Sequence, residues 1–209
     1  LEIESYRMAK SVTTVSNFDK AILDCHQIKS FLLPSYPSKS FCEVYASIAS
    51  SRKNFYQNLT ATKKRILLIG STYNPPTREG LEKILRFFEI SNFPYQVDLV
   101  GYGTSEFRYF NSDNINVLGS VSDSVLTKLM IDSHCLIINT IQTSGYLFKV
   151  VECNLSGLPI IFTTPFLQHE NLEEYGIFNC EISDLQDVIE NINPKTSFKK
   201  FKKPYFQVI

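Results

Sequence analysis

The stretch NTIQTSGYLFKVVECNLSGLPIIFT, residues 139–163, decides the expected fold. Residues 135–139 and 160–163 are short apolar runs, which predicts two buried strands. Residues 146–156 place apolar side chains at helical spacing, and a Gly-Leu-Pro turn at 157–159 follows where glycine and proline end a helix. The sequence therefore predicts a strand-helix-strand crossover, the unit of an α/β fold with a parallel, Rossmann-like sheet.

A short polar loop precedes the predicted helix. In strand-helix-strand units, ligands bind outside the carboxyl ends of the strands, where loop amides and the helix N-terminus face a crevice. Residues 142–145 occupy that place. Gly145 lets the backbone approach a ligand closely, and the hydroxyls of Thr143 and Ser144 can cap the helix or meet an anion. We therefore expect these three residues at a ligand site.

The predicted helix carries a lysine and a glutamate three residues apart, Lys149 and Glu152. A lysine near a helix N-terminus opposes the helix dipole and costs roughly 0.3–1 kcal/mol, unless a bound anion reverses the sign of that interaction. A phosphate group is such an anion, and Glu152 on the same helix face can accept hydrogen bonds from a ribose diol. The alternative is a pair between the two side chains on a solvated helix face, worth a few tenths of a kcal/mol.

This stretch resembles the donor-binding signature of the retaining GT-B glycosyltransferases known as group 1 or family 4. The residues that carry the resemblance, in the order and spacing of the signature, are Gly145, Lys149, Val150, Val151, Glu152, Gly157 and Pro159. Many members have a glutamate where this chain has Ser144, and one subgroup has a small residue there. The resemblance implies that Gly145 and Lys149 bind a diphosphate and that Glu152 binds the ribose. It also implies a place near the phosphate or sugar for Thr143 and Ser144, and a catalytic role for Lys149 and Glu152.

The resemblance covers most of the chain and implies its domain organisation. Residues 1–38 are similar to the end of the acceptor-side N-terminal domain of that family. Residues 39–63, rich in Ser, Lys, Asn and Thr, show no strong period, which favours a hinge or linker with a helix at 41–49. Residues 64–192 would then form the nucleotide-sugar donor-binding domain, and residues 193–209 a basic and aromatic C-terminal tail.

The expected donor domain opens with an apolar strand at 65–69, a glycine-containing loop and a helix at 81–90. The loop resembles that of the same subgroup at Gly70, Ser71, Tyr73, Pro75, Glu79 and Gly80. We therefore expect Gly70 and Ser71 at the donor site. Pro76 departs from the subgroup, which has asparagine there, and proline has no backbone N–H to donate. Ordinary turn chemistry is the alternative for Gly70 and Gly80.

Two more predicted strands, at 96–100 and 115–118, lead into glycine-containing turns. By resemblance, the backbone of these turns borders the nucleotide base, and the residues that form the walls of the site are Gly101, Gly103, Gly119 and Val121. When each residue is considered on its own, the alternative to a site role is a simple turn at Gly119 and helix capping by Asp123.

Composition limits the classes of function. The 209 residues include 21 basic and 21 acidic side chains, so the net charge is zero and gives no global electrostatic case for a nucleic-acid partner. With 44% hydrophobic residues the chain can bury a full core.

Five cysteines without paired spacing favour reduced thiols and a cytoplasmic location. No apolar run reaches the roughly 18 residues of a membrane span. A chain that starts at Leu1 suggests a piece of a longer protein.

Residues that could hold a metal ion or act as catalytic bases are sparse. No His, Cys, Asp and Glu cluster has zinc spacing, and no Asp-x-Asp follows a predicted strand, so we expect no metal and no other cofactor. We expect His134, just before a predicted strand, to be structural. His169 follows the strand at 160–163 and is expected to lie close to the cleft.

The C-terminal tail interleaves lysines with Phe198 and Phe201, a pattern that can hold an anionic membrane surface. The alternatives are a solvated tail or a segment that crosses back over the preceding domain. We therefore expect a cytoplasmic protein and leave open peripheral contact with the inner membrane surface.

By resemblance, the intact protein would transfer a sugar from a UDP- or GDP-linked donor to a glycan or lipid-linked acceptor, with retention of configuration. Two other functions stay open. One is a degenerate domain that binds nucleotide sugars without catalysis, which Ser144 and Pro76 favour. The other is a nucleotide-sugar epimerase of GT-B shape, which would act on the donor without any acceptor.

Overall fold

The computed structural model describes residues 2–33, 37–58, 64–91, 93–140, 148–164 and 172–200. Residues 2–33 form a small α/β unit of helices α1 (Glu2–Met8) and α2 (Asn17–Cys25) and strands β1 (Val12–Thr14) and β2 (Ser30–Leu32). The two strands pair in parallel, and Val12, Leu23 and Ile28 form a core of their own. Helix α2 begins where Ser16 Oγ accepts from the amide of Asp19 at 3.0 Å, a typical N-cap.

The larger unit is built on a six-stranded parallel sheet in the order β5-β4-β3-β6-β7-β8. Its strands are β3 (Arg65–Ile69), β4 (Gln96–Val100), β5 (Ile115–Gly119), β6 (Cys135–Ile138), β7 (Ile160–Phe162) and β8 (Ile177–Asn179). The predicted α/β class with a parallel, Rossmann-like sheet is confirmed.

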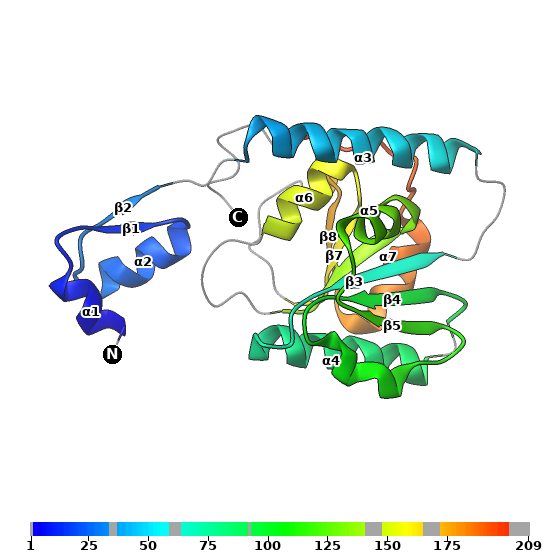
Figure 1. Ribbon diagram of the computed structural model, residues 1–209, viewed down its shortest axis with the longest axis horizontal. Coiled ribbons are helices and arrows are strands. Elements are labelled where there is room, and N and C mark those ends of the chain that lie inside the picture. Colours follow the sequence, from blue (N-terminus) through cyan, green and yellow to red (C-terminus); the bar gives the residue numbers. More distant parts are fainter. Residues whose placement is uncertain are drawn as a thin grey trace.

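Helices cover both faces of this sheet (Figure 1). The elements that follow or connect the strands are α4 (Pro75–Ile90), η1 (Thr104–Phe110), α5 (Asp123–Asp132), α6 (Phe148–Ser156), η2 (Leu172–Tyr175), η3 (Ile182–Asp184) and α7 (Leu185–Asn191). Apolar residues of α4, η1 and α7 pack on one face, and those of α5 and α6 pack on the other, together with helix α3 (Lys39–Asn58).

Helix α3 is longer than the helix predicted at 41–49, and it packs on α5 and α6. Its inward stripe is Tyr45, Ile48, Arg52 and Tyr56, of which Ile48, Arg52 and Tyr56 are buried. The stripe is narrow and includes an arginine, so the hydrophobic period of this segment is weak. That composition explains why the sequence favoured a linker with only a short helix.

Arg52 joins the ends of two helices to α3. Its side chain is only 3% exposed. Its Nη1 donates to the carbonyls of Met130, Ile131 (3.1 Å) and Ser133 (2.7 Å) at the end of α5, and its Nε donates to Gly157 O (3.3 Å) after α6. Carbonyls at a helix C-terminus carry partial negative charge and have no partner within the helix. The guanidinium therefore caps α5 and α6 together.

Helix α4 packs unusually close to β6. Gly80 lies inside α4, so the turn considered from the sequence is wrong for this residue. A Cβ at Gly80 would lie 1.5 Å from the carbonyl oxygen of Asn139, and Asn139 Nδ2 donates back to Gly80 O at 3.3 Å. Only a glycine permits this approach of helix and strand.

Several element boundaries differ from the prediction. Helix α4 begins at Pro75 rather than at residue 81, because prolines are tolerated in the first turn, where amides have no helical partner. The cap of α5 is Ser122, whose Oγ accepts from Val125 N at 3.4 Å, so the predicted cap at Asp123 is wrong. Strand β8 and turn η1 were not predicted.

Two residue-level expectations are confirmed. His134 is structural, because it is buried and its Nε2 lies 3.1 Å from the carbonyl of Ile189. Burial lowers the pKa of His134 to about 4, and the nearby Lys64 ammonium acts in the same direction, so the ring is neutral at neutral pH. The five cysteines form no disulfide bonds.

The described part of the C-terminal tail, up to residue 200, folds back on the domain. Lys199 pairs with Glu174 at 2.7 Å, and Lys200 donates to the carbonyls of Asn154 and Leu155 (3.0 Å) at the end of α6. Residues 201–209 lie outside the described part of the chain. Across the described ranges, no helix has both the length and the apolar character that a membrane crossing requires.

Replacing Arg52 by alanine should lower the free energy of unfolding by about 2–4 kcal/mol, because it leaves buried helix-end carbonyls without a donor. Urea unfolding measures the loss. Arg86→Ala is the matched control, since Arg86 forms an exposed ion pair with Glu82 and should leave the unfolding midpoint unchanged. Equal loss in both variants would contradict the capping role of Arg52.

Gly80→Ala tests the contact between α4 and β6. Helix propensity alone predicts that alanine stabilises a helix interior by up to about 1 kcal/mol. The structure predicts the opposite sign, a loss of about 1–3 kcal/mol, because the new methyl group collides with the Asn139 carbonyl. Lys83→Ala, exposed on the same helix, is the control, and a stabilised Gly80→Ala protein would show that the close approach is wrong.

Candidate functional site

The order of the strands in the sheet reverses direction between β3 and β6. Strand β3 is the first of the six in the chain, β4 and β5 extend the sheet on one side, and β6 to β8 extend it on the other. This is the order of Rossmann sheets, in which ligands bind at the carboxyl edge where the winding direction reverses. The candidate site is therefore the edge formed by the ends of β3, β4, β5 and β6.

Three of the predicted site glycines end adjacent strands along this edge. The amide of Gly70 donates to Val100 O at 3.1 Å, and the amide of Gly101 donates to Gly119 O at 2.9 Å. Gly101 has a φ of +139°, and a Cβ there would lie 1.7 Å from the carbonyl oxygen of Gly70. The backbones of Gly70 and Gly101 therefore lie too close together for a side chain at residue 101.

The structure also locates the other predicted residues of these turns. Ser71 is half-buried, and its Oγ accepts from Tyr73 N at 3.4 Å. Gly103 has a φ of +78° and starts η1. Val121 is half-buried and packs with the apolar cluster under α5 and α6, so its side chain belongs to the core.

Lys149 reaches from the first turn of α6 to the end of β3. Its Nζ donates to Ile69 O at 2.7 Å, next to Gly70. The side chain is half-buried, and burial lowers the pKa of its ammonium below the ordinary value, although the Glu152 charge acts in the opposite direction. The carboxyl end of β3 therefore has a partly desolvated positive charge beside it.

Glu152 lies one turn further along α6 and faces α3. The hydroxyl of Tyr45 is hydrogen-bonded to its carboxylate, and burial raises the pKa of Glu152 above its ordinary value. Lys149 and Glu152 are both half-buried, and each has a partner on another element, which disfavours the alternative of a simple pair on a solvated helix face.

Sequence reasoning missed Tyr45 as a partner of the site. It lies in α3, far from α6 in the sequence, and its ring packs on Phe41 with a centroid distance of 4.6 Å. The sequence did signal that Tyr45 shares a helix face with Ile48 and Arg52, because these residues are three and four positions apart. That signal shows that Tyr45 faces inward but does not show which element it meets.

Two exposed tyrosines form the rim of the edge. Tyr73 after β3 and Tyr102 after β4 are 72% and 66% exposed, and their ring centroids are 4.9 Å apart. Exposed aromatic faces can stack on flat ligand groups such as bases. The adjoining start of α4 offers few amides to a ligand, because Pro75 and Pro76 occupy its first turn.

Several predicted site residues lie outside the described part of the chain. They are Thr143, Ser144 and Gly145 of the loop before α6, and His169. Their contribution stays a prediction. Among the residues that the structure does describe, no group of three or more His, Cys, Asp or Glu side chains could hold a metal ion.

No protein-family profile matches the sequence, and no curated protein matches it. Solved structures do match. One is WaaG, a glycosyltransferase involved in lipopolysaccharide biosynthesis, with a TM-score of 0.60 at 15% identity over 88% of this chain and 54% of WaaG. Another is Anabaena HepE in complex with UDP, with a TM-score of 0.64 at 14% identity over 89% of this chain and 54% of HepE. A glycosyltransferase from Rickettsia africae matches with a TM-score of 0.61 at 16% identity, over 90% of this chain and 56% of that one.

The chain thus spans about half the length of these three proteins. The α/β fold with its six-stranded parallel sheet matches theirs, which confirms the fold expected from the sequence motifs. This chain has the fold of the C-terminal domain of a GT-B glycosyltransferase.

Proposed function

We propose that this chain is the donor-binding part of a retaining glycosyltransferase. The enzyme would transfer a hexose from a UDP- or GDP-linked donor to a glycan or lipid-linked acceptor, without a metal ion. WaaG and the Rickettsia africae protein are described as glycosyltransferases, and HepE has been solved with UDP and with UDP-glucose. These descriptions support the class of donor, and the geometry of the chain supports the place where it binds.

The position of Lys149 is the observation that carries the proposal. A lysine in the first turn of a helix is unfavourable unless it faces an anion, and this one is also partly desolvated. An ammonium group has three donors, and the Ile69 carbonyl accepts one of them. Among the described residues its other donors have no partner, and they would meet a diphosphate at the edge formed by Gly70 and Gly101.

The proposed chemistry is electrostatic. In sugar transfer, negative charge grows on the departing diphosphate, and a preorganised cation in a partly dry site stabilises that charge. Lys149 would supply the cation, and the glycine-lined edge would let the diphosphate approach the backbone. Glu152 would accept hydrogen bonds from the ribose hydroxyls, held in place by Tyr45. The hydroxyls of Thr143 and Ser144 would meet the phosphate or the sugar.

Because this chain spans about half the length of its structural relatives, the acceptor side would lie in a domain outside it. In two-domain transferases, closure of the domains excludes water and completes the catalytic site. We therefore propose that residues 64–192 bind the donor and that acceptor recognition needs the other domain. Helix α3, in the segment expected to be a hinge, would couple the domains to the donor site, because it carries Tyr45.

Calorimetric titration of this chain with UDP, GDP and ADP tests the donor site. Lys149→Ala should weaken binding of the preferred nucleotide by roughly 10- to 100-fold, the equivalent of one charge-assisted hydrogen bond. Glu152→Ala should weaken it by about tenfold. EDTA should leave the affinity unchanged.

Matched controls are Lys83→Ala and Glu89→Ala, which change exposed residues on α4. Both should bind like the parent protein. Binding that survives in Lys149→Ala would overturn the assigned role of this lysine. Nucleotide binding without sugar transfer by the full-length protein would instead favour the degenerate domain, and product formation without acceptor would favour the epimerase.

The lowered pKa of Lys149 predicts a pH dependence. The ammonium attracts the diphosphate only while it is protonated, so affinity should fall as pH rises through its pKa, which burial places below the usual 10.5. Lys149→Arg should keep affinity to higher pH, because the guanidinium stays charged. Titrations across the alkaline range measure this, and identical profiles for the parent and Lys149→Arg would rule out Lys149 as the titrating group.

A further inference from the structure

A second pocket lies at the opposite end of α6 from Lys149. It has a volume of about 210 Å³ and is bounded by α3, the C-terminal end of α6 and residues 194–200. Because α6 runs antiparallel to the strands, this end lies at the amino edge of the sheet. The pocket is therefore separate from the crevice at the carboxyl edge.

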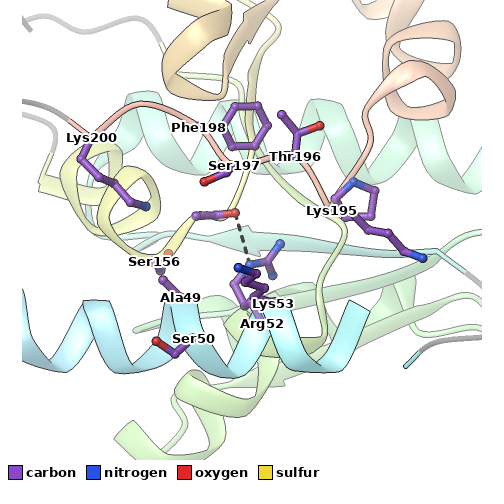
Figure 2. Close-up of a pocket in the computed structure, with 12 residues that line it drawn as sticks. Ala49, Ser50, Arg52, Lys53, Ser156, Lys195, Thr196, Ser197, Phe198 and Lys200 are labelled. Carbon is purple, nitrogen blue, oxygen red and sulfur yellow. Dashed lines mark hydrogen bonds between the residues drawn. The ribbon is translucent and has the colours of Figure 1, made fainter. Parts of the chain in front are cut away.

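The pocket is cationic (Figure 2). Arg52 and Lys53 come from α3, and Lys195 and Lys200 come from the returning C-terminal segment. Figure 2 shows Lys195 and Lys200 on opposite sides of the opening. Among the described residues that line the pocket there is no Asp or Glu. Four cationic side chains thus line this pocket.

Neutral backbone groups hold two of these cations in place. Arg52 donates to carbonyls at the ends of α5 and α6, and Lys200 Nζ donates to the carbonyls of Asn154 and Leu155. Carbonyl dipoles orient a cation but do not cancel its formal charge. Burial, with a smaller contribution from the Arg52 charge, lowers the pKa of Lys200 to about 8. The site therefore holds like charges together without an acidic partner.

We propose that this pocket binds a phosphate-bearing anion, either a small soluble phosphate ester or the phosphate headgroup of a lipid. A phosphate oxygen accepts hydrogen bonds from lysine and from hydroxyl groups. The rim supplies exposed hydroxyls at Ser50, Thr196 and Ser197. A bound dianion would offset the repulsion between Arg52 and Lys200. The proposal is independent of nucleotide binding at the carboxyl edge.

Amide NMR spectra of this chain, recorded with added glycerol 3-phosphate at constant ionic strength, test the site directly. The amides of Gly157 and Ser197 should shift with increasing ligand, since both residues line the pocket. Lys53→Gln and Lys200→Gln should each weaken the binding by several-fold, and the double variant by about tenfold. Glutamine at 200 keeps a donor for the α6 carbonyls.

Lys83→Gln is the matched control, because it removes an exposed lysine from the other face of the sheet. It should leave the shifts unchanged. Shifts confined to Gly70 and Gly101 and lost in Lys149→Ala would mean that the anion occupies the donor crevice, which overturns the proposal. The absence of shifts at Gly157 and Ser197 would overturn it too, as would equal weakening by Lys83→Gln.

Sedimentation with phosphatidylcholine vesicles, with and without phosphatidic acid, distinguishes the two sources of phosphate. Binding that needs phosphatidic acid, falls in the Lys53→Gln and Lys200→Gln variants and is displaced by glycerol 3-phosphate would support a lipid headgroup. Shifts with glycerol 3-phosphate but no vesicle binding would support a soluble ester. If neither ligand binds through these two lysines, the proposal is wrong.

Discussion

Two-sided burial of the central strands is the constraint on which the rest of the structure depends. Along β3, Ile66 and Leu68 point into the cluster with α4, whereas Leu67 points into the cluster with α5 and α6, and all three are fully buried. A parallel strand that is apolar on both faces needs a helical layer on each side. The chain must therefore wind in one direction from β3 to β5 and in the other from β6 to β8. The crevice at the carboxyl edge follows from that reversal.

Helix α6 connects the chemistry at the two edges of the sheet. Its first turn places Lys149 against the end of β3, its second turn places Glu152 against Tyr45, and its last carbonyls are capped by Lys200 and Arg52. The three cations, Lys149, Lys200 and Arg52, donate to backbone carbonyls rather than to a carboxylate. Such a cation keeps its charge available for an anionic ligand. The two ends of one helix can thus serve two different anions.

Much of the larger unit could be predicted from the sequence, because several of its strands are continuous apolar runs and helix α6 ends in a Gly-Leu-Pro signal. The bounds of β3 and β4 agree with the prediction, and the crossover around α6 is present. The misses have physical causes. Helix α3 buries a stripe that includes an arginine, so its period is weak, and α4 begins with two prolines that resemble a loop. Ser122 and Asp123 are both good capping residues, and only the backbone geometry decides between them.

By itself, the sequence determined the alternation of strands and helices and the residue types at the loop ends, because periodicity and turn chemistry are local properties. Only the tertiary structure decided which loops meet. The contact of Lys149 with Ile69, of Glu152 with Tyr45, and of Arg52 with the ends of α5 and α6 each joins segments far apart in the chain. These contacts depend on strand order and helix packing, which are set by the burial of the whole sheet.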